Sequence, residues 1–384
     1  MNGPRTYLDY NATAPLRPEA RAAMLSALDL HGNASSVHAE GRRARQTIEA
    51  ARVELGRLAG APARDVIFTS GATEAANQVL SGPWRAILVS AVEHPAVIAA
   101  AKRNGAEVIV VPVDHLGLVA GDALATQLDR LSGAQGLRGE DILVAVQQAN
   151  NETGVVQPIA EIAEIVAGQG ARLMVDAVQA AGRIAIAASE RRPDYVVLSS
   201  HKIGGPLGAG ALIAREGAPL TPLLTGGGQE RGRRAGTENV AAIAGFGAAA
   251  AAAARDLATE PMRLEHLRDR LETELAVAAP DMVVIGRQAQ RLCNTTLVAL
   301  AGAPAETAVI ALDLAGVAAS AGAACSSGKT TRSPVLAAMG IDDDIARCAV
   351  RFSLGWASKM DDVSRAAEAW QRVDRIRGSA RQVA

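Results

Sequence analysis

Short apolar runs rich in β-branched residues alternate with longer, alanine-rich segments along the first two thirds of the chain. Most of these runs lack the regular alternation of polar and apolar residues that marks a half-exposed strand. Continuously apolar strands are typical of a largely parallel sheet that helices cover on both faces. We therefore predict an α/β fold around such a sheet. The seven predicted strands are 65–70, 86–90, 107–113, 142–147, 172–178, 195–200 and 210–215.

The segments between the strands predict helices, and the pattern changes after the alanine run at 248–254. Two of the helices are expected after Pro95 and Pro158, because proline is favoured in the first turn of a helix. A long helix at about 260–278 precedes "CNTTLVAL", "GVAAS" and "AVRFSL", with further helices between them. This order predicts a smaller α+β domain. The expected division is a large domain at 15–255 and a small domain made of 1–14 and 256–384.

Composition narrows the class of protein. Of the 384 residues 49% are apolar but only 2% are aromatic, so the core must consist mainly of Ala, Val, Leu and Ile. The formal net charge is −1, and the sequence shows no run of like charges, no membrane-length apolar stretch and no signal peptide. We therefore expect a cytoplasmic protein without nucleic-acid or membrane partners. Cys293, Cys325 and Cys348 form no close pair, which argues against a disulfide framework and a structural zinc site.

One lysine lies where a buried strand is expected to end. The stretch "VVLSSHKIGGPLGAG" at 196–210 passes from apolar residues through two serines and a histidine to Lys202. The chain has only four lysines, and its other basic residues are almost all arginine. A desolvated lysine, unlike arginine, can lose its proton and form a Schiff base. A lysine at a strand end more often extends its ammonium into solvent, so a special function for Lys202 needs support from its surroundings.

Further polar residues follow other strands and are expected at the same edge of the sheet. In "FTSGATEAAN" a strand, a glycine turn and a helix start follow one another, so Ala72 and Thr73 offer an anion cradle suited to phosphate. His94 ends another strand. Asp176, with Gln179 three residues later, lies among apolar neighbours and requires a cation or a donor. Pyridoxal phosphate needs such a set: a phosphate cradle, a carboxylate for its ring nitrogen, a lysine for its aldehyde and a stacking partner.

The chain resembles the cysteine desulfurases of the NifS/IscS type, within the class V aminotransferase family of fold-type I pyridoxal-phosphate enzymes. The motifs that carry this resemblance extend almost from end to end, and their order and spacing together are specific. They are "YLDYNATAP", "HGNASSVH", "FTSGATEAAN", "EHPAV", "NNETGVVQP", "DAVQAAG", "SSHKIGGPLGAGAL", "GGGQERGRRAGTEN", "SAGAACSSG" and "RFSLG". The resemblance implies that the chain is a pyridoxal-phosphate enzyme and a homodimer.

The resemblance also implies a function for individual residues at the cofactor. Lys202 corresponds to the Schiff-base lysine, Asp176 to the partner of the ring nitrogen and Gln179 to the partner of the ring hydroxyl. His94 corresponds to the residue that stacks on the ring. The implied phosphate ligands, beside the Ala72 cradle, are Thr73, Ser199, His201 and, from the neighbouring subunit, Thr237.

The implied substrate is L-cysteine, and the implied nucleophile is Cys325 in the small, polar stretch "SAGAACSSGKTTRSP". Asn151, also expected at the cofactor, and Arg351 resemble the pair that fixes the substrate carboxylate, a task that suits the guanidinium fork. Lys202 would move the proton at the substrate Cα. The Cys325 thiolate would then attack the substrate sulfur, leaving a persulfide and alanine, with His94 placed to move the thiol proton.

The sulfur acceptor is expected to be an iron–sulfur scaffold or another acceptor protein. Pro334 stands where relatives often carry histidine, an alanine replaces the common serine before the Ala-Cys pair, and the tail after the last helix is short. These departures concern the acceptor and leave the catalytic residues in place. We expect no resident metal, with Cys325 a candidate transient iron–sulfur ligand. The alternatives are a selenocysteine lyase, a class V aminotransferase and a non-catalytic desulfurase-like binding partner, and Lys202, Asp176 and Cys325 together argue against the last.

Overall fold

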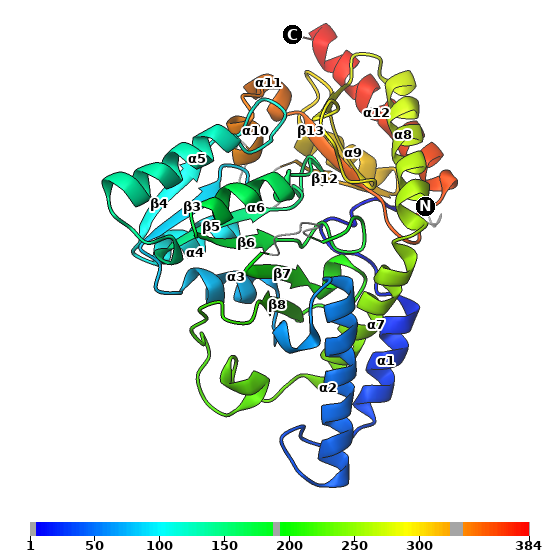
Figure 1. The fold of residues 1–384 in the computed structure, drawn as a ribbon. Coiled ribbons are helices and arrows are strands. Elements are labelled where there is room, and N and C mark those ends of the chain that lie inside the picture. Colours follow the sequence, from blue (N-terminus) through cyan, green and yellow to red (C-terminus); the bar gives the residue numbers. More distant parts are fainter. Residues whose placement is uncertain (1–4, 187–192, 323–332, 384) are drawn as a thin grey trace.

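The computed structural model describes residues 5–186, 193–322 and 333–383, and a seven-stranded sheet lies at its centre (Figure 1). The strands are Val66–Thr69 (β2), Ala86–Ser90 (β3), Glu107–Val111 (β4), Ile142–Gln147 (β5), Arg172–Asp176 (β6), Tyr195–Ser199 (β7) and Gly210–Ala214 (β8). Their spatial order is β2-β8-β7-β6-β5-β3-β4. β8 runs antiparallel to β2 and β7, and the other neighbours are parallel. The predicted fold class and all seven strands are confirmed.

Helices cover both faces of this sheet. They are Ala39–Leu58 (α2), Ala72–Leu80 (α3), Pro95–Arg103 (α4), Gly121–Asp129 (α5), Ile159–Gly168 (α6) and Val240–Asp256 (α7). In β3, Leu88 packs in a core with α2, α5, α6 and α7, whereas Ile87 and Val89 pack in a second core with α3 and α4. Figure 1 shows α5 and α6 on one side of the sheet and α3 and α4 on the other. Burial on both sides explains the continuously apolar strand sequences.

The alanine run lies in α7, which packs against α2 and against α1 (Pro18–Leu28). Small side chains let these helices approach closely. A Cβ added to Gly247 would lie 2.5 Å from the Cβ of Ala51 in α2, closer than two carbon atoms can pack. Ala249, Ala250 and Ala253 of α7 are buried in the same core. A core of small aliphatic residues therefore replaces the aromatic residues that the composition lacks.

A smaller, four-stranded sheet has the order β12-β13-β10-β9. Its strands are Val283–Ile285 (β9), Thr295–Ala299 (β10), Ser320–Ala321 (β12) and Ala349–Ser353 (β13), and beside it Thr6–Tyr7 (β1) pairs in parallel with Val317–Ala318 (β11). Leu8 packs in one core with Leu271, Phe352 and Trp370, so the N-terminal residues lie against the last third of the chain. The division of the chain at residues 15 and 256 stays a prediction.

The helices of this second part are Glu260–Ala278 (α8), Ala305–Leu314 (α9), Pro334–Ala338 (α10), Asp343–Ala346 (α11) and Met360–Val383 (α12). α8 confirms the long helix expected at about 260–278, and it packs along α12. None of the helices in the described ranges is by itself long and apolar enough to cross a membrane. α7 and α8 pass that test of length and composition only as a pair, and they are bent by 78° to one another.

Candidate active site

A cavity of about 420 Å³ lies at the carboxyl ends of β5, β6 and β7. Gln147, Asp176 and Ser199 end these strands, and all three line the cavity. Polar side chains from several distant segments thus meet at one edge of the sheet, as the parallel strands led us to expect. The predicted residues on the cavity wall are Ala72, Thr73, His94, Asn151, Asp176, Gln179, Ser199, His201, Lys202 and Arg351.

The N-terminus of α3 forms one end of the cavity. The helix begins at Ala72 directly after Gly71, so its first backbone N–H groups have no intrahelical acceptor and can bind an anion. Gly210 of β8 lies against this turn, because a Cβ added there would be 2.5 Å from the Cα of Gly71. Glycine at 210 thus lets the sheet approach the turn closely. Thr73 is exposed, which leaves its hydroxyl accessible from the cavity.

Lys202 lies on the cavity wall, at the end of the short helix Ser200–Lys202 that follows β7. Its Nζ donates hydrogen bonds to the carbonyl oxygens of Asn11 at 2.6 Å and Ala12 at 2.7 Å. The side chain is only partly exposed. The ammonium is therefore held by the N-terminal segment inside the site, and the solvent-directed arrangement that is more common for a strand-end lysine does not apply.

Asp176 and His94 influence one another electrostatically across the cavity. The Asp176 Oδ1 accepts a hydrogen bond from Val178 N at 2.9 Å. Burial raises the pKa of Asp176, while that hydrogen bond and the positive charges of His94 and Lys202 act in the opposite direction. Burial also lowers the pKa of His94. The carboxylate thus lies in a poorly solvated position that a cationic partner would stabilise.

His94 is not part of a strand, contrary to the sequence-based prediction. β3 ends at Ser90, and His94 is the N-cap of α4, where its Nδ1 accepts from Ala96 N at 3.2 Å. Proline at 95 disfavours helical backbone in the preceding residue, which explains the extended conformation of His94. Because Nδ1 accepts, the neutral ring carries its proton on Nε2 and presents a donor.

His201 is neutral at physiological pH, because burial and the nearby Lys202 charge lower its pKa to about 4. Its Nδ1 lies 2.9 Å from the Oγ1 of Thr13, within hydrogen-bonding distance. The imidazole is therefore fixed by the same N-terminal segment that holds Lys202. A neutral ring can donate one hydrogen bond to an anion without adding charge to the site.

Gln179 is oriented by a residue that sequence reasoning missed. Arg183 Nη1 donates to the Gln179 side-chain oxygen at 2.9 Å and to its carbonyl oxygen at 2.7 Å. Gln179 Nε2 donates to the Asn11 carbonyl at 3.1 Å. The amide therefore has a defined orientation. Burial and the nearby Arg351 lower the pKa of Arg183 to about 10, so it remains charged at neutral pH.

Arg351 and Asn151 are neighbours, as the resemblance implied. Arg351 lies on β13 and is 2% exposed. Its Nη1 donates to the carbonyl oxygen of Asn151 at 2.9 Å, and its Nη2 donates to Asp9 Oδ1 at 2.7 Å. Among the described residues, its Nε has no hydrogen-bond partner. Asp9, a residue that sequence reasoning missed, thus holds one side of the guanidinium. The Nε of Arg351 remains an unused donor.

The structure places a third missed residue, Asn11, at the centre of the site. Its side chain donates to Thr295 Oγ1 at 2.9 Å and to the Asn151 carbonyl at 3.2 Å, and its Oδ1 accepts from Asn294 Nδ2 at 3.1 Å. Its own carbonyl accepts from Lys202 and Gln179. The polar run "DYNAT" was a signal for a site here, but a local pattern cannot say which distant residues it meets.

A buried acid, Glu93, lies directly before His94 and was also missed. Ser90 Oγ donates to its Oε1, and Gln147 N donates to the same oxygen at 2.7 Å. Its Oε2 has no hydrogen-bond partner within the described part of the chain. Burial, together with the charge of Asp176, raises the pKa of Glu93 to about 8. Glu93 is therefore mostly protonated at neutral pH.

Thr237 is a predicted site residue that does not line this cavity. Thr237 is exposed and lines a separate cavity of about 230 Å³, which shares Ser70, Gly208 and Ala209 with the first. Cys325 falls in 323–332, outside the described residues. The other two cysteines, Cys293 and Cys348, are buried, and burial raises the pKa of Cys293 to about 11, which fits an inert thiol.

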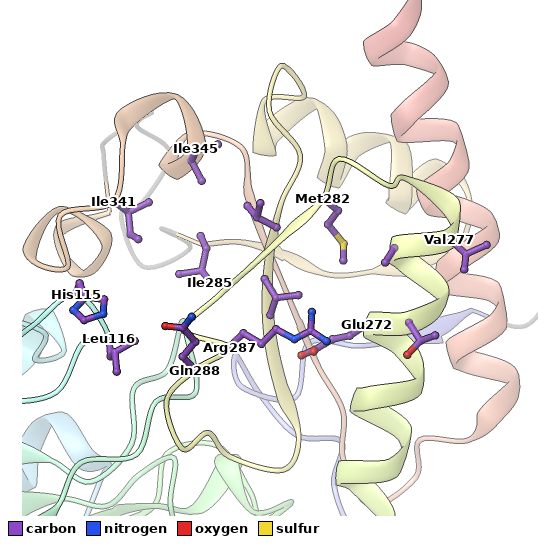
Figure 2. A pocket seen from close by; sticks show the side chains of 15 residues that line it. His115, Leu116, Glu272, Val277, Met282, Ile285, Arg287, Gln288, Ile341 and Ile345 are labelled. Carbon is purple, nitrogen blue, oxygen red and sulfur yellow. The ribbon is translucent and has the colours of Figure 1, made fainter.

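A larger cavity of about 830 Å³ contains none of the predicted site residues. Figure 2 shows its side chains, which come from α8, from β9 and the loop after it, from the region of α11 and, as His115 and Leu116, from the segment after β4. Apolar groups such as Val277, Met282 and Ile341 dominate this wall. The cavity at the sheet edge is smaller, but it is the one that combines a lysine, a carboxylate, imidazoles and a helix N-terminus.

Comparisons with known proteins identify the family of this chain. The aminotransferase class-V family matches residues 6–366. The cysteine desulfurase IscS 1 of Archaeoglobus fulgidus is 39% identical, over 94% of this chain and 95% of that protein. The structure of a NifS-like protein from Rickettsia africae has a TM-score of 0.86 and 33% identity, covering 97% of this chain and 99% of that one. SspA, solved in complex with cysteine, has a TM-score of 0.76 and 26% identity, covering 91% and 98%. The chain therefore belongs to the aminotransferase class-V family.

Proposed function

We propose that this protein is a pyridoxal-phosphate-dependent cysteine desulfurase, which converts L-cysteine to L-alanine and leaves a persulfide on Cys325. The observation that carries the proposal is the arrangement of Lys202, Asp176 and the α3 N-terminus around one cavity. The cavity belongs to a chain that is 39% identical to a curated cysteine desulfurase over nearly its whole length. The family relationship and the site chemistry thus point to the same activity.

The residues present fit pyridoxal phosphate. The cavity, at about 420 Å³, is within the range of about 300–1,000 Å³ typical of small-molecule sites. The α3 N-terminus with Thr73, Ser199 and His201 would hold the phosphate, and Asp176 would meet the ring nitrogen. A protonated ring nitrogen supplies the cation that a buried carboxylate requires. When bound, the cofactor withdraws electrons from the substrate Cα.

The chain's own residues would orient L-cysteine and move its protons. Arg351, which lines the cavity and contacts Asn151, would bind the substrate carboxylate. Lys202 would transfer the proton at Cα once it leaves its bonds to the Asn11 and Ala12 carbonyls. His94 presents Nε2–H to the cavity. To relay the thiol proton, its Nδ1 must take up a proton and release Ala96 N.

Two subunits would complete the site. Thr237 is exposed and lies outside the cavity that holds the other predicted cofactor residues of its own chain. A residue in that position is free to reach the phosphate of a neighbouring subunit, which supports a homodimer. The persulfide sulfur would pass to an iron–sulfur scaffold or another acceptor protein in the cytoplasm, for iron–sulfur cluster assembly.

Replacing Cys325 with serine tests the activity directly. Serine is nearly isosteric with cysteine but has almost no anionic form at neutral pH and little affinity for sulfur. Cys325→Ser should stay folded, keep the cofactor and still bind L-cysteine, but release of alanine and sulfide should fall at least a hundredfold. The measurements are alanine and sulfide formed per enzyme with a thiol reductant present, and mass spectrometry of the peptide that contains residue 325.

Cys293→Ser and Cys348→Ser are matched controls, because both thiols are buried away from the cavity. They should keep their turnover or lose it only through stability. If Cys325→Ser keeps most of its turnover, the persulfide mechanism is wrong and a lyase becomes the better assignment. If the wild type transfers amino groups between amino and keto acids instead, it is an aminotransferase. If borohydride reduction attaches no pyridoxal phosphate to Lys202, the cofactor assignment fails.

A further inference from the structure

A buried hydrogen bond connects the substrate end of the cavity to the segment that follows Cys325. Ser333 Oγ donates to Glu152 Oε2 at 2.6 Å, and the two residues are 3% and 7% exposed. Neither side chain lines the cavity. Ser333 Oγ also accepts from Leu336 N at 3.2 Å, which makes Ser333 the N-cap of α10. The serine hydroxyl thus joins a helix end to a buried acid.

The loop that carries Glu152 is itself fixed. The Asn150 side-chain oxygen accepts hydrogen bonds from the backbone N–H groups of Glu152 and Thr153, both at 2.9 Å. The neighbouring residue, Asn151, lines the cavity, and its carbonyl accepts from Arg351. A group attached to Glu152 is therefore positioned relative to the proposed binding site for the substrate carboxylate.

The chain enters and leaves the stretch that contains Cys325 at two anchored points. On the entering side, Ser320 of β12 is the register partner of Arg351, and Gly322 N donates to the Ala349 carbonyl at 2.9 Å. On the leaving side, Ser333 is bound to Glu152. Cys325 is three positions after Gly322 and eight before Ser333. In general, anchors at both ends limit the conformations open to a chain segment.

We propose that Glu152 is a positioning residue for sulfur transfer, which acts by anchoring Ser333 and thereby raises the effective concentration of the Cys325 thiolate at the substrate sulfur. The proposal rests on the proposed function. The chemistry it serves is the attack of the thiolate on the sulfur of L-cysteine, in which an S–S bond forms and the C–S bond breaks. The electron pair of that C–S bond stays on the alanine carbon, which takes up a proton.

The protonation state of Glu152 sets the strength of this anchor. An ionised carboxylate accepts a stronger hydrogen bond than a neutral one. Burial raises the pKa of Glu152 to about 7, against the opposing effects of the Ser333 hydroxyl and the Arg351 charge. Arg351 is the charged group that faces it. The anchor should therefore strengthen as the pH rises through about 7.

The test compares single-turnover formation of the Cys325 persulfide in the holoenzyme and in variants of the anchor. Ser333→Ala should slow persulfide formation about tenfold, the loss expected for one hydrogen bond to a charged group, while spectrophotometric binding of L-cysteine changes less than about twofold. Ser333→Thr keeps a hydroxyl and should restore the rate. In Glu152→Gln, the rise of the rate near pH 7 should disappear. A rise at higher pH that comes from ionisation of the Cys325 thiol should remain.

A matched control separates anchoring from helix capping. Asp342 caps α11 through a 2.8 Å bond from Asp344 N, and its hydrogen bonds do not include Glu152, so Asp342→Ala removes a comparable cap. Its persulfide rate should equal that of the wild type. Equal rates in Ser333→Ala and wild type, or a slow Ser333→Thr, would overturn the proposal. A wild type that forms no alanine from L-cysteine would instead overturn the proposed function.

Discussion

Single residues in this site are defined mainly by the cost of burying them. Lys202, Asp176 and Glu93 are ionisable groups in poorly solvated positions, and each is held by backbone or side-chain hydrogen bonds. Of the three, Glu93 has the clearest consequence. Its pKa is raised by burial to about 8, well above the ordinary value of a glutamate. The folded protein therefore keeps a proton on Glu93 that the unfolded chain releases.

Glu93 should make the folded state less stable as the pH rises. Its stabilising contribution is complete below the unfolded pKa near 4.5 and is lost as the pH rises toward the folded pKa of about 8. Between pH 6 and 8 the loss is on the order of 2–3 kcal/mol. The glutamine in Glu93→Gln cannot titrate, so the free energy of unfolding of this variant should fall by about 2–3 kcal/mol less than that of the wild type between pH 6 and 8. The measurement is urea unfolding of both proteins at several pH values. If the free energy of unfolding changes with pH in the same way in both proteins, the raised pKa of Glu93 is wrong.

The sequence predicted the residues that follow strands, but not the residues that hold them. Asp176 and Ser199 could be located because the ends of parallel strands meet at one edge of a sheet. Asn11, Asp9 and Arg183 could not be located in this way. Their importance comes from contacts with residues that are more than a hundred positions away in the chain, or from the orientation of a neighbour's amide, and a local pattern carries no information about either.

At the scale of elements, strand positions were predictable but strand direction and order were not. An apolar run has the same sequence pattern in a parallel and in an antiparallel pair, so β8 gave no sign in its residues of running against β7. The short connection at 200–209 was the available signal, because a parallel crossover needs a dozen or more residues. The two-residue strands β1 and β12 are too short to show a pattern of their own, whereas β11 lies within the predicted run "GVAAS".

The contact between β8 and the start of α3 can be tested at Gly210. In Gly210→Ala the new Cβ would lie 2.5 Å from the Cα of Gly71, so the turn before α3 must move. We expect a loss of about 1–3 kcal/mol in the free energy of unfolding and a clear fall in pyridoxal-phosphate affinity, because the phosphate cradle moves with the turn. Unfolding curves and cofactor titration of the apoenzyme measure the two effects.

Gly168 provides the control for this substitution. It ends α6, and a Cβ added there has no heavy atom within 4 Å. Gly168→Ala should therefore leave cofactor affinity unchanged and stabilise the protein by up to about 1 kcal/mol. Equal cofactor affinity in Gly210→Ala and the wild type would show that the α3 turn does not hold the phosphate.

At the scale of the whole molecule, the proposed homodimer makes cofactor binding depend on protein concentration. If Thr237 completes the phosphate site of the neighbouring subunit, Thr237→Ala should lower pyridoxal-phosphate affinity about tenfold, the effect of one hydrogen bond to a charged group. Thr237 is exposed, so the free energy of unfolding should change little. Equilibrium titration of the cofactor, with sedimentation at several protein concentrations, measures both quantities. A monomer that retains the cofactor as tightly as the dimer would refute the shared site.

The cavity also joins segments that lie far apart in the chain. Asp9 and Ser353 form an isolated parallel bridge, Asn11 N donates to Ser353 Oγ, and Arg351 donates to Asp9. The ribosome makes residue 353 more than three hundred residues after residue 9, so the strands of the large sheet can emerge and pair before these contacts exist. The site is therefore completed only after residue 353 has been made, and the small molecule that fills it can be captured only after that point.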